Sequence, residues 1–238
     1  DGASDTPETA PSSGKGFYFL AGLLLFLIAG AGAWYTYNAY IKKTAPPVIS
    51  MPQSRFISAE SSSAFDISSL SREEIFQAIT DTSDGTQSNE LIHIVVRNST
   101  STEATITQFL DRLESSAPGS LVRAFQPTFM LGSLGQSRFI ILKLASYENA
   151  FGGMLNWELN LPFDLAGLFV ESEALKSIGP DNVFKDIVSR NKDVRALLPG
   201  EETGLVYSFL GQDFLIITDK LDTLSTLIDR LTRETLTR

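Results

Sequence analysis

The stretch FMLGSLGQSRFIILKL, from Phe129 to Leu144, consists of two apolar runs on either side of a glycine. The runs Phe129–Leu134 and Phe139–Leu144 each have the length of a strand, and Gly135 followed by Gln136 suits a tight turn between them. The stretch therefore predicts a β-hairpin, and with it an antiparallel sheet.

Helix and strand patterns flank this hairpin on both sides. Ser71 and Glu74 have the spacing of a capping box before an apolar run, which predicts a helix start, and Leu91–Val96 is a β-branched run of strand length. The order of these elements predicts an α+β fold with a mostly antiparallel sheet and helices packed on one face. The other expected elements are a helix around Ile106–Leu113, a helix from Tyr147 that ends or is interrupted at Pro162, the strands Phe184–Val188, Val194–Leu198, Leu205–Phe209 and Phe214–Thr218, and a helix from about Leu221.

A long uncharged stretch lies near the start of the chain. Residues 16–41 are 26 residues without a formal charge, and as a helix they would reach roughly 39 Å, which exceeds the ~30 Å hydrocarbon core of a bilayer. The stretch therefore predicts a transmembrane helix, with membrane lipid as its surroundings. Aromatic side chains near both ends are expected at the membrane interfaces: Phe17, Tyr18, Trp34, Tyr35, Tyr37 and Tyr40.

Two other interpretations of this stretch stay open. A short apolar run followed by the small residues Ala29–Ala33 also fits a cleavable signal peptide, although the aromatics continue past that point. Lys15-Gly16-Phe17 is similar to a type IV prepilin processing site, but Ala21 stands where such pilins carry an acid. Pro46-Pro47 would also interrupt a long pilin helix.

Composition divides the chain into four segments. Residues 1–15 are rich in Pro, Ser and Thr and predict a disordered tail, and residues 42–70 contain prolines and a serine-rich run typical of a linker. Within this linker, Val48–Met51 and Phe56–Ala59 are expected to be short extended pieces. The globular α+β domain is then expected over residues 71–238.

The side chains that usually carry chemistry are scarce. The chain has no cysteine and one histidine, His93, so it lacks a usual zinc set and a cysteine nucleophile. Residues 44–238 carry 25 acidic and 16 basic residues, which disfavours nucleic acid as a partner. We therefore predict a structural or surface role for His93, no catalytic residues, no metal site and no cofactor, and leave enzymatic activity uncertain.

The most charged stretch of the expected sheet is FKDIVSRNKDVR, from Phe184 to Arg195. Its alternating charges predict cross-strand ion pairs or a turn, and they equally suit a recognition edge. The candidate interaction residues are Asp186, Arg190, Lys192, Asp193 and Arg195.

Two pairs of residues carry smaller predictions. Gly152 and Gly153 lie in a helical pattern and are expected to permit close packing. Asp219 and Asp222 precede the last helix and are expected to cap it.

Two blocks, Phe129–Phe169 and Phe184–Thr218, resemble an uncharacterised family of single-span membrane proteins from small-genome candidate-phylum bacteria. The resemblance implies an N-terminal anchor and an α+β domain at the cell envelope, and it supplies no catalytic positions. One lysine before the span and two after it weakly favour a cytoplasmic domain. With the resemblance included, we expect the domain to be extracytoplasmic.

These observations lead to one expected function and several alternatives. We expect a non-catalytic, single-pass binding or scaffolding protein of the cell envelope with a protein partner. Self-association is a further possibility, because Ala29 and Ala33 are spaced for close helix contact. The alternatives are a hydrolase acting on envelope polymers and an accessory subunit of a pilus or secretion machine.

Overall fold

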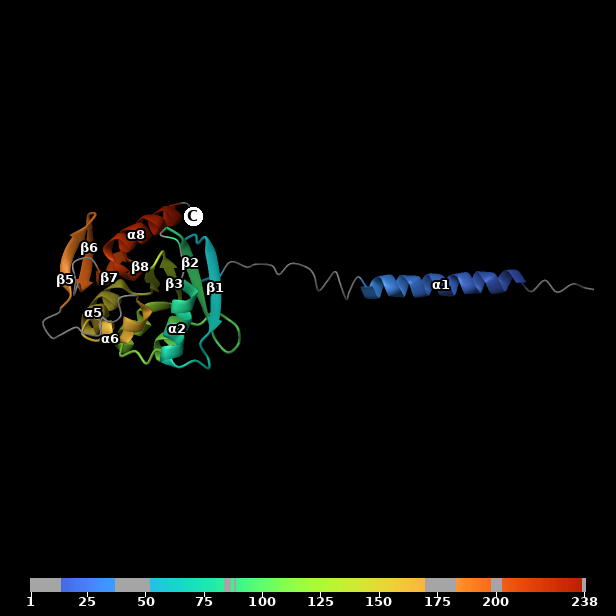
Figure 1. Cartoon of the computed structure of the whole chain (residues 1–238), viewed down its shortest axis with the longest axis horizontal. Helices are drawn as coiled ribbons and strands as arrows, with labels where there is room; N and C mark the ends of the chain where they lie inside the picture. The colour runs from blue at the N-terminus through green and yellow to red at the C-terminus, as the bar shows by residue number, and fades with distance from the viewer. Residues whose placement is uncertain are drawn as a thin grey trace, which may run out of the picture. The chain divides into compact units, whose positions relative to one another are not determined.

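A computed structural model of the chain describes residues 14–36, 52–83, 87, 89–169, 183–197 and 203–236. The chain forms two compact units, Asp1–Ser50 and Met51–Arg238. The first unit contains helix α1, Gly14–Thr36, and the second contains the α+β domain (Figure 1).

Helix α1 is apolar over Tyr18–Tyr35, with a mean hydropathy of 1.8, and none of that stretch is buried. At about 1.5 Å per residue the helix is roughly 34 Å long, which is enough to cross a bilayer core. A helix of this kind at an N-terminus serves either as a membrane anchor or as a signal sequence.

Some of the expected interface aromatics can be located in this helix. Tyr18, Trp34 and Tyr35 are exposed near its ends, and Phe17 lies in its first turn. Tyr37 and Tyr40 lie outside the described residues, as do most of the expected tail and the first part of the expected linker.

The domain is built on one eight-stranded sheet with the order β1-β2-β3-β4-β8-β7-β6-β5. All neighbouring strands are antiparallel except β1 and β2, which are parallel. The α+β fold with a mostly antiparallel sheet is therefore confirmed. The strands are β1 (Ser61–Asp66), β2 (Leu91–Arg97), β3 (Phe125–Leu134), β4 (Ser137–Leu144), β5 (Lys185–Ser189), β6 (Lys192–Leu197), β7 (Thr203–Leu210) and β8 (Phe214–Lys220).

The hairpin predicted around Gly135 lies near the middle of this sheet. Strands β3 and β4 pair through register partners such as Met130 and Ile141, and Gly135 has a φ of 58° in the turn. Glycine adopts this left-handed backbone without a steric penalty, which explains why the chain reverses at that residue.

Helices cover both faces of the sheet, so the prediction that they pack on one face is wrong. Along β4, Phe139 and Ile141 point to one face and Ile140 and Leu142 to the other, and both faces are buried. A strand that is apolar on both faces needs a covering layer on each. The helices on one face are α2 (Arg72–Ser83), α3 (Ile106–Arg112), α4 (Gly119–Arg123), α5 (Tyr147–Trp157) and α6 (Leu161–Leu165), which is followed by a 3-10 turn (Ala166–Leu168), and α8 (Leu221–Leu236) lies on the other (Figure 1).

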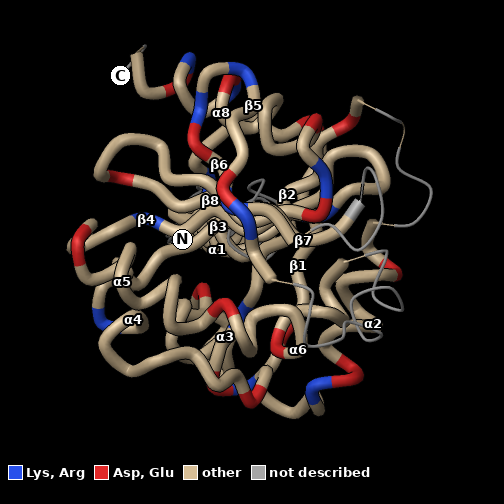
Figure 2. Tube along the Cα trace, turned by 90° about the vertical axis from the view of Figure 1, so that its left-hand side faces the viewer, with Lys and Arg blue, Asp and Glu red and all other residues tan. Residues whose placement is uncertain are grey.

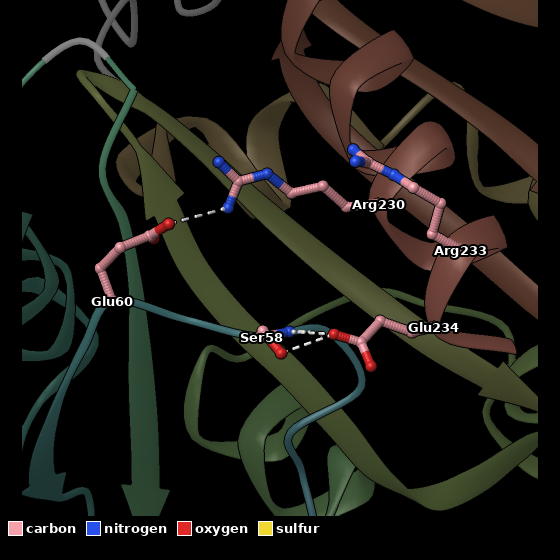
Figure 3. Close-up of a pocket in the computed structure, with 5 residues that line it drawn as sticks. All are labelled: Ser58, Glu60, Arg230, Arg233 and Glu234. Carbon is pink, nitrogen blue, oxygen red and sulfur yellow. Dashed lines mark hydrogen bonds and ion pairs between the residues drawn. The ribbon is translucent and has the colours of Figure 1, made fainter. Parts of the chain in front are cut away.

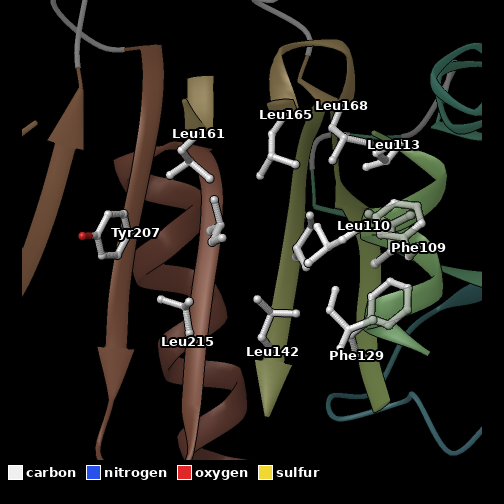
Figure 4. Close-up of a cluster of buried hydrophobic side chains, with 14 of the residues drawn as sticks. Phe109, Leu110, Leu113, Phe129, Leu142, Leu161, Leu165, Leu168, Tyr207 and Leu215 are labelled. Carbon is white, nitrogen blue, oxygen red and sulfur yellow. The ribbon is translucent and has the colours of Figure 1, made fainter. Parts of the chain in front are cut away.

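The larger core lies between the sheet and the group of helices that includes α3 and α6 (Figure 4). Phe109 of α3 stacks on Phe129 of β3 with ring centroids 5.1 Å apart. Tyr207 of β7 belongs to the same core, but its hydroxyl points away from the other buried side chains (Figure 4).

The predicted start of α2 is confirmed in detail. The backbone N–H of Ser71 donates to the Glu74 carboxylate at 2.7 Å, and the N–H of Glu74 donates to the Ser71 hydroxyl at 3.3 Å. This reciprocal pair is a capping box, and it satisfies two amides that lack partners inside the helix.

The domain begins earlier than the expected boundary at residue 71. Residues 61–66 form β1 instead of a linker, and Ile57 and Ile67 are almost fully buried. Phe56–Ala59 is not a strand but packs on the face covered by α8, and Val48–Met51 lies outside the described residues. The serine-rich composition of β1 resembles a linker because an edge strand needs few apolar side chains.

Candidate interaction surface at the edge of the sheet

Strands β5 and β6 form a hairpin at one end of the sheet, where β5 is the edge strand among the described residues. Its two turn residues, Arg190 and Asn191, have φ angles of 47° and 63°, the backbone of a turn that matches the twist of the flanking strands. The turn predicted in this stretch is therefore confirmed. Figure 2 shows acidic and basic residues interspersed along the hairpin.

The charged side chains of this hairpin lie on two different faces of the sheet, because successive side chains along a strand point to opposite faces. Asp186 lies opposite Arg195, and Val188 lies opposite Asp193. Arg195 in turn lies opposite Tyr207, which belongs to the core on the α5 side. These four hairpin residues therefore share the α5 side, where acids outnumber bases.

Two basic residues of the hairpin, Arg190 and Lys192, lie toward the opposite face. Lys192 alternates with Asp193 and so lies on the side of α8. Arg190, in the turn, approaches Asp222 and Asp229 of α8 with nitrogen–oxygen distances of 3.9 Å each. These pairs are long and exposed, and such pairs contribute little to stability.

Arg195 anchors the hairpin to the end of α5. Its Nε and Nη2 donate to the two carboxylate oxygens of Glu158 at 2.7 and 2.6 Å, and its Nη1 donates to Asp186 at 3.0 Å. The hydroxyl of Tyr207 donates to Glu158 Oε1 at 2.7 Å. A two-pronged contact of this kind fixes both direction and distance, so α5, β6 and β7 are held in one arrangement.

The electrostatics of this network suit a structural role. The hydrogen bond to Glu158 outweighs burial and raises the pKa of Arg195 above its ordinary value. Burial, together with the bond to Glu158, raises the pKa of Tyr207. Arg195 therefore stays charged and Tyr207 stays neutral across the physiological range, and neither exchanges a proton there.

An apolar strip continues from this network across the strands. Val188 of β5 lies opposite Asp193 of β6. Arg195 lies opposite Tyr207 of β7, so the same register carried two residues further brings Phe209 level with Asp193, and Ser208 beside it donates to the Asp193 carbonyl at 2.7 Å. Val188, Asp193 and Phe209 thus form a row over β5, β6 and β7.

The Phe209 ring contacts the rings of Tyr147 and Phe151 on α5, with centroids 5.3 and 5.8 Å apart. We call this row, together with Phe151, Asp186, Glu158 and Arg195 beside it, the edge surface.

Two apolar members of the edge surface are open to solvent. Val188 is 73% exposed and Phe151 is 43% exposed, and Asp186 and Asp193 flank Val188 on the same side. Exposed apolar residues bordered by charge are typical of contact surfaces. The arrangement thus combines exposed apolar surface with bordering carboxylates.

The structure divides the predicted interaction residues into two groups. Asp186, Asp193 and Arg195 lie on the α5 side, whereas Arg190 and Lys192 lie toward α8. Sequence reasoning missed the residues that complete the site, because they come from α5 and β7; the alternation of aromatics in the strand Leu205–Phe209 was the available signal. The missed residues are Tyr147, Phe151, Glu158, Tyr207 and Phe209.

A second, polar site lies on the α8 side. A pocket of about 420 Å³ is lined by Ser58, Glu60, Arg230, Arg233 and Glu234 (Figure 3). Glu60 accepts from the N–H of Leu91 at 2.7 Å and approaches Arg230 at 3.4 Å, and Glu234 accepts from both the N–H and the hydroxyl of Ser58. These bonds tie the segment before β1 to α8 and β2.

The pKa of Glu60 in this pocket is lowered. Burial opposes ionisation of Glu60, but the bond from Leu91 and the nearby Arg230 outweigh it and lower the pKa of Glu60. A general acid needs a raised pKa instead. Glu60 is therefore unsuited to act as a general acid, and its contacts with Leu91 and Arg230 support an anchoring role.

The single histidine contacts a serine in the interior. His93 is fully buried, and its Nε2 lies 3.2 Å from the hydroxyl of Ser54. Its Nδ1 has no hydrogen-bond partner within the described part of the chain, so the acid that would orient a catalytic histidine is missing. Burial lowers the pKa of His93 to about 4. The contact joins the segment before β1 to β2, as expected for a structural histidine.

Asp219 has a different role from the predicted cap. It lies in β8, is fully buried, and its Oδ1 accepts a hydrogen bond from the hydroxyl of Ser137 on β4. The other oxygen, Oδ2, has no partner within the described residues. Within the described residues, its side-chain partners are the hydroxyls of Ser137 and Thr218 on the sheet and not an amide of α8, so the cap prediction is wrong for Asp219.

No protein-family model, curated protein or solved structure matches this chain. A functional proposal therefore rests on the geometry of the chain itself.

Proposed function

We propose that this protein is a non-catalytic, single-pass membrane protein of the cell envelope, whose extracytoplasmic domain binds a protein partner through the edge surface. The observation that carries the proposal is the row of Val188, Asp193 and Phe209 beside Phe151, in which apolar side chains are exposed and acids border them.

The anchoring part of the proposal is supported by α1. The helix is long enough to span a bilayer, and Tyr18 and Trp34 stand near its two ends, where amphipathic rings favour the headgroup level. The resemblance of Phe129–Phe169 and Phe184–Thr218 to single-span envelope proteins supports the same location.

The chemistry of the edge surface selects the kind of partner. Its charged members Asp186, Asp193 and Glu158 outnumber its one base, Arg195, which Glu158 and Asp186 already bind. A complementary segment carries lysine or arginine around apolar residues, because opposite charges steer association and apolar contact holds the complex. We infer a basic, apolar segment of a neighbouring envelope protein as the partner.

Charge reversal on the two sides of the hairpin tests this assignment. A photo-reactive amino acid at Val188 of the membrane-bound, full-length chain is expected to capture a discrete partner, and D186K/D193K is expected to abolish the capture. The matched control D222K/D229K reverses two acids on the α8 side and is expected to leave capture unchanged. Equal loss in both variants, or no adduct at Val188, overturns the proposal.

Anchoring and orientation need separate experiments. Carbonate washing of membranes is expected to leave the chain in the pellet, because a spanning helix resists alkaline extraction whereas a peripheral protein is released. Protease added to intact cells is expected to digest the domain. Release by carbonate overturns the anchor, and survival of the domain until lysis overturns the extracytoplasmic placement.

A further inference from the structure

A small cavity on the α8 side of the sheet is separate from both the edge surface and the interior histidine. Its volume is about 170 Å³, and part of its floor is a cross-strand pair in which Lys143 of β4 lies opposite Phe214 of β8. Lys143 follows Ile141 by two residues and therefore points, like Ile141, to the face covered by α8. Thr128 of β3 lines the same cavity.

The segment before β1 forms one wall of this cavity with Arg55 and Phe56. The N–H of Phe56 contacts the sulfur of Met130 on β3 at 3.4 Å, and the Phe56 ring lies 5.6 Å from the Phe214 ring, centroid to centroid. The last turns of α8 close the opposite side with Glu234. Three parts of the domain that are far apart in the sequence therefore enclose one space with two phenyl rings.

Two basic side chains at this cavity lack an acidic partner. Arg55 and Lys143 are both half-buried, and neither forms an ion pair with any residue in the part of the chain that the structure describes. A cation that is partly withdrawn from water is stabilised by a nearby anion. Two unpaired bases at one cavity are notable in a chain whose net charge is −9.

The acids near this cavity are bound to other donors. Glu234 accepts from both the N–H and the hydroxyl of Ser58, and Glu103 accepts from the N–H groups of Gln53 and Ser54 at 2.9 Å each. Among the described residues that line the cavity, two bases face one acid, which leaves a net charge of +1. That balance suits a ligand with a single negative charge.

We propose that this cavity binds a small carboxylate that carries an apolar group. The carboxylate lies between Arg55 and Lys143, because a guanidinium pairs with carboxylate oxygens through two parallel hydrogen bonds and an ammonium adds a compact charge. The apolar group packs against Phe56 and Phe214. The cavity is smaller than the roughly 300 Å³ at which drug-sized ligands begin, so the ligand is compact.

Two sources supply this chemistry, a free organic acid and the last residue of a peptide with an apolar side chain. Either ligand would connect the segment before β1 to β4, β8 and α8. The site goes beyond the proposed binding of a protein partner, since the edge surface consists of residues from α5, β5, β6 and β7 on the other face of the sheet.

Calorimetric titration of the full-length chain in neutral detergent micelles tests the site, with phenylacetate as the probe. One phenylacetate is expected to bind per chain, and phenylacetamide, which has the same ring without the charge, is expected to bind at least about tenfold more weakly. Equal affinities for the acid and the amide, or no binding of phenylacetate at millimolar concentration, overturn the proposal. Tighter binding of inorganic phosphate than of phenylacetate overturns the assignment to a carboxylate.

Charge-removing variants locate the binding. Lys143→Met and Arg55→Met keep a long apolar side chain, and each is expected to weaken phenylacetate binding about tenfold. Lys192→Met, which removes an exposed base of the β5–β6 hairpin, is the matched control and is expected to bind as the parent chain does. The fluorescence of buried Trp157 verifies that each variant is folded. Unchanged affinity in both cavity variants, or an equal loss in the control, overturns the proposal.

A tripeptide that ends in phenylalanine distinguishes the two sources. If the tripeptide with a free carboxyl terminus binds at least as tightly as phenylacetate and its amidated form does not, the site recognises a peptide terminus. If phenylacetate binds and the tripeptide does not, the site recognises a free acid. Both results support the carboxylate site, whereas equal binding of the free and amidated tripeptides contradicts it.

Discussion

Gly153 of α5 lies so close to Leu121 of α4 that a Cβ added to the glycine would stand 2.7 Å from the leucine Cβ. Real Cβ atoms do not approach this closely, so only glycine permits the two helices to pack as they do. A Cβ on the preceding residue, Gly152, would meet nothing within 4 Å. The expectation that this glycine pair permits close packing is therefore confirmed for Gly153 alone.

The two glycines provide a matched pair of substitutions. Gly153→Ala is expected to lower the free energy of unfolding by about 1 to 2 kcal/mol, because overpacking outweighs the better helix propensity of alanine. Gly152→Ala is expected to raise it by about 0.5 to 1 kcal/mol, since only the propensity changes. Urea unfolding of the solubilised chain, followed by the fluorescence of the buried Trp157, measures both. Similar effects at the two positions would contradict the packing described above.

The two carboxylates that bind Arg195 are expected to differ in importance. The Glu158 side chain is 13% exposed and that of Asp186 is 87% exposed. Glu158→Gln is expected to lower the free energy of unfolding by about 2 kcal/mol, because the partly buried Arg195 loses its charged partner and the hydrogen bond from Tyr207 becomes weaker. Asp186→Asn is expected to lower the free energy of unfolding by less than about 0.5 kcal/mol, since water screens an exposed ion pair. The same unfolding assay compares them, and an equal cost would place the anchor of the hairpin elsewhere.

His93 is expected to make stability depend on pH in the acidic range. Burial is the main cause of its lowered pKa; Arg55 adds to it, and Glu103 opposes it. The unfolded chain takes up a proton near pH 6.5, whereas folded His93 stays neutral down to about pH 4. The contribution of His93 is thus complete above pH 6.5 and is lost as pH falls toward 4, a change of about 3 kcal/mol at about 1.4 kcal/mol per unit.

His93→Gln removes this titration. The variant is expected to be less stable at neutral pH, because its amide fits the buried site imperfectly, but its stability should vary less between pH 6.5 and 4. Urea unfolding at a series of pH values measures both effects. Parallel pH profiles for the variant and the parent chain would show that His93 is not the titrating group.

Asp219 is expected to act with the opposite sign. Burial raises the pKa of its carboxyl, against the hydrogen bond from Ser137 and the charge of Lys220. The folded chain therefore holds this proton to a higher pH than the unfolded chain does. The contribution of Asp219 to the free energy of unfolding is therefore complete below the ordinary aspartate pKa, and it is lost as pH rises through the raised pKa of the folded chain.

Asp219→Asn keeps an acceptor for Ser137 and removes the charge. The variant is expected to be more stable than the parent chain at neutral pH, and the difference should shrink on acidification. Thermal unfolding at neutral and acidic pH measures this difference. A variant less stable than the parent at neutral pH would show that the carboxylate has a partner that the isolated chain does not reveal.

The elements that sequence predicted correctly are those whose signals are local. The capping box at Ser71 involves groups only three residues apart, and the hairpin at Gly135 requires one residue that tolerates a positive φ. The strands from Phe184 onward were found in the same way, from short apolar alternation between turns. Local hydrogen bonding and backbone freedom determine such features before any packing occurs.

The site could be predicted only in part, because some of its contacts join residues that lie far apart in the sequence. The opposite charges of Asp186 and Arg195 indicated a cross-strand pair, and the structure contains it. Glu158 lies 37 residues from Arg195 and 49 from Tyr207, so no sequence spacing connects the three. Their contact arises only when α5 packs across β6 and β7.

The sequence by itself thus determined the apolar N-terminal helix, the α+β class and the edge hairpin, because periodicity and turn residues act over a few positions. Only the tertiary structure decided that β1 joins the sheet, that α8 covers the opposite face, and how the charges of the hairpin divide between the two faces. Each of these depends on which surfaces are buried together, and that is a property of the whole folded chain.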